Sequence, residues 1–354
     1  MRSLLLVFAV GCSDYAFIPK EPDGSGPIDT GTSRTDTGEG DPDGDAGLAS
    51  IRGRVCDLAG EGYVVGARVW VELDDTGDGL PDRTIESVTD ADGYFTLDGV
   101  PMGNHTVRVQ KGSFTTSFEV LVSAPGTLEL AEEECLQQED VRIAVVTGEY
   151  DHIQSFLGRM GLEYTAYNGV TGSQYIDFLT DPDEMAEYDI IFFNCGVADT
   201  WLTRKNEIGT NIRDYVANGG SIYASDWAYY FFEAAFPDEV DFYEDDLVYG
   251  SAFVGLDGGV VADVLDPNMI AILGTNQADL RYDLAAWVVP VSARSTVSTM
   301  VRGTARLYYG GQVAGVPLAV RLERGGTAIY TTFHNEQQIT LHMEELLEEI
   351  ILSL

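Results

Sequence analysis

The sequence has few positively charged residues. Only 20 lysines and arginines accompany 58 aspartates and glutamates in 354 residues, which gives a formal net charge of −38 at pH 7. A surface this negative repels nucleic acid and anionic lipid headgroups, so neither is an expected partner. The acidity serves solubility, or it attracts divalent cations. The hydrophobic fraction of 45 % is typical of a globular protein, and the length suits two domains.

The N-terminus lacks a hydrophobic run long enough to span a bilayer. Arg2 precedes the short apolar stretch "LLLVFAV", Leu4 to Val10, and Gly11 and Cys12 follow. This arrangement resembles a bacterial lipoprotein leader, with "AVGC" in the place of the lipobox. The resemblance implies that residues 1–12 are a signal peptide and that Cys12 becomes lipidated. The protein would then be exported and lipid-anchored, at the outer membrane, in the periplasm or at the cell surface. The alternative is an ordinary N-terminus with a chance cysteine.

Cysteine is scarce, with four in the chain. Besides Cys12, Cys56 and Cys135 bracket one predicted domain, and Cys195 lies beyond it. A disulfide persists outside the cytosol, so we expect Cys56 to pair with Cys135 and Cys195 to remain free. Spacing alone also allows Cys56 and Cys135 to be two buried thiols.

Residues 13–49 have almost no large apolar side chains after Ile28. They consist mainly of Gly, Pro, Thr and Asp, as in "EPDGSGPIDTGTSRTDTGEGDPDGDAG". Such a segment cannot bury enough surface to offset its ordering entropy. The sequence therefore predicts a disordered acidic linker, kept extended by its like charges.

Residues 50–137 contain short runs of alternating apolar and polar residues, separated by Gly, Asp and Pro turns. This pattern predicts a small antiparallel β-sandwich. The stretches "IRGRV", "GARVWVE" and "TDADGYFTLDGVPMGNHTVRV" resemble the carboxypeptidase regulatory-like domain. That resemblance implies a transthyretin-like sandwich in a carbohydrate-binding-like fold group. Such domains are usually accessory and non-catalytic, and the fold alone does not imply sugar binding.

One loop of the predicted sandwich has the spacing of a calcium site. In "DDTGDGLPD", Asp74, Thr76, Asp78 and Asp82 occupy positions 1, 3, 5 and 9, and Gly79 occupies position 6. Oxygen atoms at this spacing can converge on one Ca²⁺, as in the calcium loops of dockerin and thrombospondin-type repeats, which this loop resembles. Calcium is thus the one cofactor that the sequence predicts. The alternative is a solvated acidic hairpin loop.

Residues 138–354 alternate between apolar strands and helices. The strands "VRIAVVTG", "YDIIFFNCG" and "SIYASDW" are continuously apolar, which predicts a parallel sheet covered on both faces by helices. Residues 237–325 suggest an inserted β-rich portion, and "LHMEELLEEIILSL" suggests a terminal helix on the sheet. Ligands of such sheets bind outside the carboxyl ends of the strands. The strand ends Gly148-Glu149, Asn194-Cys195-Gly196 and Ser225-Asp226-Trp227, with His334, should share one crevice.

The second half also resembles the class I glutamine amidotransferase-like fold, near its trehalose-utilisation-type relatives. The matching stretches are "YDIIFFNCG", "IRDYVANGGSIYASDWAYYFFEAAFP" and "GGTAIYTTFHNEQQ". The resemblance implies a flavodoxin-like α/β domain. In catalytic members a Cys nucleophile sits on a strand-to-helix elbow, and a downstream His-x-Glu completes the triad. His334 and Glu336 match that His and Glu, whereas Asp226 stands where the Cys belongs.

The aspartate changes the expected chemistry. A carboxylate attacking an amide would form a mixed anhydride, so a glutaminase is not expected. Asp226, His334 and Glu336 could instead form an acid/base or metal-binding cluster, and the "FHNE" stretch could equally have a purely structural role.

The predicted ligand-binding residues surround this cluster. They are Asn194, Cys195, Gly196 and Trp227. Cys195 can also be a small inert residue at a strand end. The aromatic run from Tyr223 to Phe232 suits core packing, or a shelf for a sugar ring.

Three functions are compatible with these patterns. The first is a non-catalytic surface lipoprotein that binds a saccharide or cell-envelope component. The second is a hydrolase or isomerase on a sugar-like substrate, using Asp226, His334 and Glu336. The third is a structural surface spacer.

Overall fold

This computed structural model describes residues 47–60, 62–138, 140–242, 252–334 and 339–354. Cys12, the predicted leader, most of the predicted linker and Glu336 lie outside the described residues. The chain from Asp45 to Leu354 forms one compact unit. Among the described residues, no helix is both long enough and apolar enough to cross a membrane.

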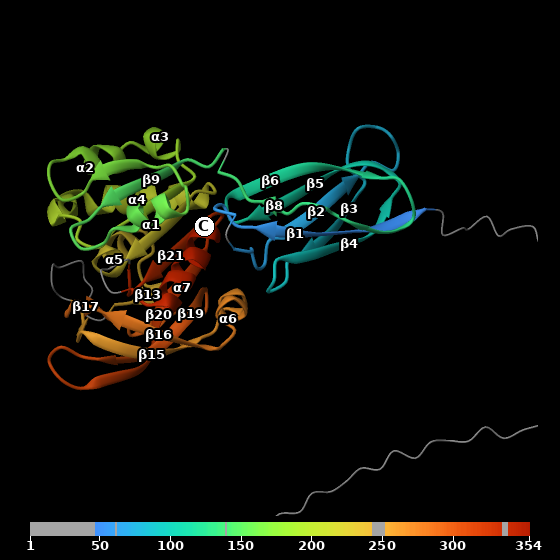
Figure 1. The fold of residues 1–354 in the computed structure, drawn as a ribbon. Helices are drawn as coiled ribbons and strands as arrows, with labels where there is room; N and C mark the ends of the chain where they lie inside the picture. The colour runs from blue at the N-terminus through green and yellow to red at the C-terminus, as the bar shows by residue number, and fades with distance from the viewer. Residues whose placement is uncertain (1–46, 61, 139, 243–251, 335–338) are drawn as a thin grey trace, which may run out of the picture. The chain divides into compact units, whose positions relative to one another are not determined.

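The first half of this unit is a β-sandwich of two sheets (Figure 1). One sheet has the order β4-β1-β7, with β8 also paired to β1, and the other has the order β3-β2-β5-β6. The strands are β1 (Leu48–Cys56), β2 (Arg68–Leu73), β3 (Arg83–Val88), β4 (Tyr94–Pro101), β5 (Gly103–Lys111), β6 (Phe114–Val122), β7 (Gly126–Glu129) and β8 (Glu134–Cys135). Alternate residues such as Val69, Val71 and Val107 point into the core and are fully buried.

Two pairings in the sandwich are parallel, although the sequence predicted an antiparallel arrangement. Strand β1 pairs with both β7 and β8 in parallel, and all other strand pairs of the sandwich are antiparallel. The parallel pairing arises because the chain crosses from β6 in one sheet to β7 in the other. Cys56 and Cys135 stand opposite each other in β1 and β8 and are joined by a disulfide.

The second half is built on one mixed sheet with the order β10-β9-β11-β12-β21-β20-β19-β15-β16. From β10 to β21 the pairs are parallel, and from β21 to β16 they are antiparallel. The strands are β9 (Ile143–Thr147), β10 (Thr165–Asn168), β11 (Ile190–Phe193), β12 (Ser221–Ser225), β15 (Gly258–Val264), β16 (Gln277–Tyr282), β19 (Val297–Arg306), β20 (Gln312–Glu323) and β21 (Thr327–Thr331). The predicted β-rich portion is therefore a continuation of the main sheet. Short ribbons are formed by β13 (Val240–Asp241) with β18 (Ser292–Ala293), and by β14 (Val254–Gly255) with β17 (Trp287–Val288).

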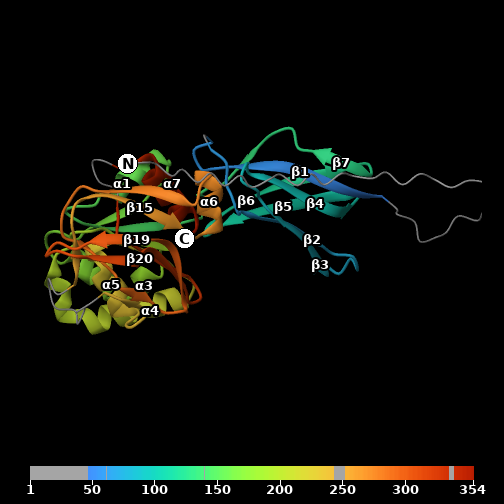
Figure 2. The same ribbon diagram turned by 90° about the horizontal axis from the view of Figure 1, so that it is seen from below.

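Helices cover both faces of this sheet, as the continuously apolar strands predict (Figure 2). Ile143 and Val145 of β9 belong to one hydrophobic cluster, and the alternate residues Ala144 and Val146 belong to the other. The first cluster includes α1 (Ile153–Arg159), α6 (Pro267–Leu273) and α7 (Leu341–Leu352). The second includes α2 (Gln174–Leu179), α3 (Pro182–Met185), α4 (Lys205–Ala217) and α5 (Tyr229–Ala235).

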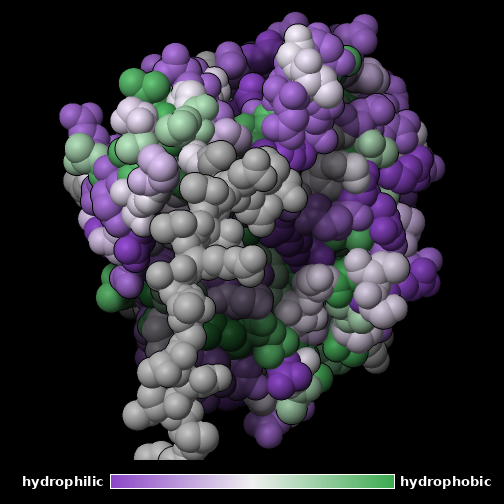
Figure 3. Space-filling view, turned by 90° about the vertical axis from the view of Figure 1, so that its right-hand side faces the viewer, coloured by the Kyte–Doolittle hydropathy of each residue, from purple (hydrophilic) through white to green (hydrophobic). Residues whose placement is uncertain are grey.

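One face of the molecule is shown in Figure 3. Hydrophilic residues cover most of it, and hydrophobic residues appear between them in separate groups. This agrees with the strongly acidic composition of the chain.

Candidate functional site

The predicted site residues follow four neighbouring strands, β9, β11, β12 and β21, and lie at the carboxyl ends of these strands. The loops that follow β9 and β11 are held together through their backbones. The Glu149 N–H donates to the Gly196 carbonyl and the Tyr150 N–H to the Cys195 carbonyl, each at 3.2 Å. The structure thus brings together the strand ends that the sequence predicted to share a crevice.

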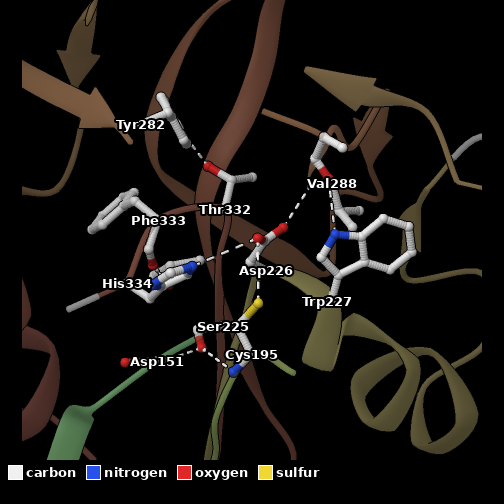
Figure 4. Close-up of polar contacts among 12 residues, drawn as sticks. Asp151, Cys195, Ser225, Asp226, Trp227, Tyr282, Val288, Thr332, Phe333 and His334 are labelled. Atoms are coloured by element: carbon white, nitrogen blue, oxygen red, sulfur yellow. Dashed lines mark hydrogen bonds and ion pairs between the residues drawn. The ribbon is translucent and has the colours of Figure 1, made fainter. Parts of the chain in front are cut away.

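Cys195, Asp226 and His334 meet at this edge (Figure 4). The Cys195 Sγ lies 3.5 Å from the Asp226 Oδ2, and the His334 Nε2 lies 3.6 Å from the same oxygen. The exposed fractions are 1 %, 5 % and 1 % for the three residues in chain order. The cluster is therefore closed to solvent. Glu336, the third residue of the predicted acid/base set, lies outside the described residues.

Asp226 occupies a sharp turn directly after β12. Its φ is +45°, in the left-handed region that aspartate tolerates better than most residues, and a 3-10 turn (Asp226–Ala228) leads from it into α5. Its Oδ1 accepts a 2.6 Å hydrogen bond from the Val288 N–H of β17. Its backbone carbonyl accepts a 3.2 Å hydrogen bond from the Tyr330 hydroxyl. The turn thus carries a carboxylate that is hydrogen-bonded to the main chain of β17.

Ser225 and Asp151 support the cluster from the other side. The Ser225 hydroxyl donates to the Asp151 Oδ2 at 2.5 Å and accepts from the Cys195 N–H at 3.1 Å. Sequence analysis placed Ser225 among the strand ends of the predicted crevice without a chemical role, and it assigned no role to Asp151. A polar residue that ends a continuously apolar strand, as Ser225 does, is the sequence signal for such a supporting role, and Ser225 is fully buried.

The cluster is poorly suited to thiol chemistry. Burial, followed by the Asp226 carboxylate, raises the pKa of the Cys195 thiol well above its usual value. A thiol with a raised pKa is protonated at neutral pH and is a weak nucleophile. The segment from Ala286 to Val288 contacts both Asp226 and its neighbour, because the Trp227 indole N–H donates to the Ala286 carbonyl at 2.8 Å and the Val288 N–H donates to Asp226.

A cavity of about 290 Å³ lies beside the cluster. Its wall includes the aromatic residues Tyr150, Trp227 and Tyr230 and the carboxylates Glu149 and Asp199. These residues follow β9, β11 and β12, so the cavity lies where ligands of α/β sheets bind. Sequence analysis did not single out Asp199, and it considered Tyr230 only as part of the aromatic run that suits core packing or a shelf for a sugar ring.

The predicted ligand-binding residues divide into two pairs. Gly196 and Trp227 line the cavity, whereas Asn194 and Cys195 are at most 1 % exposed and do not line it. The Asn194 amide donates to the Asp151 carbonyl at 3.0 Å and to the Gln154 side-chain oxygen at 2.8 Å. Asn194 and Cys195 are thus buried and separate from the cavity lining, and ligand contact by either stays a prediction.

The acidic residues predicted to bind calcium lie in the exposed loop between β2 and β3. The Asp74 carboxylate accepts hydrogen bonds from the N–H groups of Gly77, Asp78 and Gly79, at 2.6, 3.1 and 2.7 Å. The Asp82 Oδ2 accepts one from the Thr76 N–H at 2.9 Å. The Gly79 hydrogen bond is the main cause of a lowered Asp74 pKa. The loop is thus organised around an ionised Asp74, and calcium binding stays a prediction.

Comparison with known proteins identifies the sandwich. Residues 50–131 match the carboxypeptidase regulatory-like domain family. No curated protein matches the chain. One similar solved structure is a ThuA-like protein from Bacteroides uniformis, 10 % identical, covering 60 % of this chain and 91 % of its own, with a TM-score of 0.41. Another is the glutaminase domain of Trypanosoma brucei CTPS, 12 % identical, covering 60 % and 94 %, with a TM-score of 0.36.

A third similar structure concerns the sandwich alone. It is a carbohydrate-binding-type protein from Pseudomonas aeruginosa, 17 % identical, covering 26 % of this chain and 88 % of its own, with a TM-score of 0.19. The predicted resemblance of the first domain is confirmed, since residues 50–131 are a carboxypeptidase regulatory-like domain within a multidomain chain.

Proposed function

We propose that this protein is a lipid-anchored binding protein of the cell envelope and that its α/β domain holds a saccharide in the aromatic cavity. The observation that carries the proposal is the cavity itself. It combines aromatic rings with carboxylates at the carboxyl ends of β9, β11 and β12.

The lining of the cavity suits a sugar ring. Aromatic rings bury large apolar surfaces and can pack against the apolar face of a pyranose, and carboxylates accept hydrogen bonds from its hydroxyls. A volume of about 290 Å³ is at the lower end of small-molecule sites, which favours one or two sugar units. The acidic lining disfavours anionic ligands such as nucleotides.

Binding is favoured over catalysis because the titratable cluster is enclosed. Asp226 and His334 are 5 % and 1 % exposed, so a substrate in the cavity would meet the side chain of Trp227 before either of them. A hydrolase or isomerase that uses these residues as acid and base would first have to expose their buried side chains to the substrate. The spacer hypothesis predicts neither ligand nor activity.

The lipid anchor is supported by the leader-like sequence that ends at Cys12. The acidic residues of 13–49 would separate the folded part from the membrane surface. Expression of the full chain beside a Cys12→Ala variant tests the anchor. The full chain should fractionate with membranes and the variant should not, and equal partitioning of the two would contradict the anchor.

Saccharide binding is tested by probing glycan arrays with the purified protein and by titrating the protein with soluble peptidoglycan fragments. Tyr150→Ala and Asp199→Asn should each weaken binding by about tenfold, the loss of one good contact. Tyr309→Ala is the matched control, because Tyr309 is 91 % exposed and does not line the cavity. Absence of binding by the folded protein would contradict the proposal. Turnover of a glycan that is lost in His334→Ala would favour the hydrolase or isomerase instead.

A further inference from the structure

Three different donor atoms meet behind the wall of the aromatic cavity. They are the Cys195 Sγ, the Asp226 Oδ2 and the His334 Nε2, and each lies within 4.8 Å of the other two. We propose that they bind a transition-metal dication, with Zn²⁺ as the expected ion. This site goes beyond the proposed saccharide binding, because its ligands are buried and do not line the cavity.

The Nε2–Oδ2 distance fits shared coordination of one metal ion better than a hydrogen bond, and the Sγ–Oδ2 distance suits either shared coordination or an S–H···O hydrogen bond. In tetrahedral zinc sites the metal–sulfur distance is about 2.3 Å and the metal–nitrogen and metal–oxygen distances are about 2.0–2.2 Å, so ligand atoms lie roughly 3.3–3.7 Å apart. The Sγ–Oδ2 and Nε2–Oδ2 separations are 3.5 Å and 3.6 Å. An N–H···O hydrogen bond is normally about 2.7–3.2 Å long. The imidazole is therefore too distant for a good hydrogen bond to Asp226, but well placed to share a cation with it.

The donor set also selects the type of metal. Thiolate and imidazole favour zinc and related transition metals over Ca²⁺ and Mg²⁺, which take oxygen ligands. A thiolate, a carboxylate and a neutral imidazole around a dication form a set with no net charge. Such a set costs less to bury than separate ions, which matters because no ligand is more than 5 % exposed.

The surrounding hydrogen bonds hold the ligands in position (Figure 4). The Val288 N–H occupies the Asp226 Oδ1, which leaves the Oδ2 directed at the Cys195 and His334 donors. The Ser225 hydroxyl holds the Cys195 backbone N–H, and Asp151 in turn orients that hydroxyl. Outer contacts of this kind fix ligands and tune affinity in metal sites. Three protein ligands leave one tetrahedral position for water or another donor.

Metal titration of the whole protein tests the site. After treatment with EDTA, Zn²⁺ or Co²⁺ is added both to the folded protein and during refolding, because the ligands are buried. We expect one ion per chain by elemental analysis. The Co²⁺ form should show the visible bands of a tetrahedral site and the near-ultraviolet absorption of a cobalt–thiolate bond.

Variants assign the ligands. Cys195→Ser should abolish the cobalt–thiolate absorption, and both it and His334→Gln should weaken Zn²⁺ binding by at least about tenfold. His342→Gln is the matched control, because the His342 Nδ1 faces the Asp279 carboxylate at 3.9 Å on the surface, and it should bind like the wild type.

Two results would overturn the site. One is that the folded protein binds neither Zn²⁺ nor Co²⁺, whether the ion is added to the folded protein or during refolding. The other is Co²⁺ binding without the thiolate absorption, which would place the ion elsewhere. Neither result depends on saccharide binding, so the two proposals fail separately.

Discussion

At the scale of single residues, Asp226 determines what the α/β domain can do. It lies on the sharp turn between β12 and α5, with a φ of +45°. Its carboxylate accepts a hydrogen bond from the Val288 N–H of β17, a strand of the short β14–β17 ribbon that lies far along the sequence. The residue is therefore both a structural anchor and a member of the buried cluster.

Substitutions at Asp226 separate these two contributions. Asp226→Ala removes the acceptor of the Val288 N–H and places alanine at a positive φ, so it should lower the free energy of unfolding by about 2–4 kcal/mol. Asp226→Asn keeps an acceptor oxygen, and asparagine tolerates a positive φ, so this variant should lower the free energy of unfolding by less than half as much. Chemical denaturation in the presence of EDTA measures both. Equal losses for the two variants would contradict the anchoring role.

Part of the site could be predicted from the sequence. Asp226 and His334 follow apolar strands, and strand ends on one edge of a parallel sheet must converge. The bond from Val288 could not be predicted, because a backbone N–H has no side-chain signature. Burial of Asn194 and Cys195 behind the cavity wall also depends on the exact direction of each side chain at a strand end, which hydrophobic patterning does not fix.

At the scale of elements, hydrogen bonds from backbone N–H groups to Asp74 organise the loop between β2 and β3. Millimolar Ca²⁺ should raise the melting temperature by a few degrees if the ion takes over these oxygens, in line with about 1 kcal/mol of binding free energy. The double variant Asp74→Asn/Asp78→Asn should not respond. Scanning calorimetry with Ca²⁺ and with Mg²⁺ checks this, and an identical response from the wild type and the variant would contradict calcium binding in this loop.

The elements themselves were predictable to differing degrees. Continuously apolar β9 and β11 and alternating β2 and β5 were recognised from their patterns. Helix α6 was missed, although Asp266 caps it, Pro267 starts it and Gly274 ends it in the left-handed conformation. These are standard helix boundary signals. The place of β15 and β16 in the main sheet could not be predicted, since it depends on pairing with β19, a strand remote in sequence.

At the scale of the whole molecule, the compact unit from Asp45 to Leu354 contains a buried ion pair between β5 and α7. The Lys111 Nζ lies 2.6 Å from the Glu349 Oε1, and both side chains are at most 5 % exposed. A cavity of about 230 Å³ beside them is lined by further carboxylates, including Asp57, Glu345 and Glu348. Lys111 forms an ion pair with Glu349, and the carboxylates around the cavity outnumber this one lysine.

This crowding predicts a pH-dependent stability. Burial, and then the charges of Asp57, Glu349, Glu345 and Glu344, raise the pKa of Glu348 to about 7 from an ordinary 4.5. The folded protein therefore keeps a proton on Glu348 over a range in which the unfolded chain loses it. The contribution of Glu348 to the free energy of unfolding is therefore fully present below pH 4.5 and is lost as the pH rises to about 7.

The measurement is urea denaturation of the wild type and Glu348→Gln at several pH values. Between pH 4.5 and 7.5 the free energy of unfolding of the wild type should fall by about 1–2 kcal/mol more than that of the variant. This figure allows for solvent screening of a partly exposed group. Glu187→Gln is the control, because Glu187 is in an exposed ion pair with Arg142 and should follow the wild type. Parallel pH profiles for the wild type and Glu348→Gln would contradict the raised pKa.

The adjacency of β12 and β21 also matters for biosynthesis. β21 and His334 enclose the Cys195 thiol, yet they are synthesised long after it. Until β21 docks, the Cys195 thiol lacks this cover, whereas Cys56 and Cys135 belong to the sandwich, which is synthesised earlier. In an oxidising compartment an uncovered Cys195 could attack the disulfide between Cys56 and Cys135, so we expect docking of β21 to protect that bond.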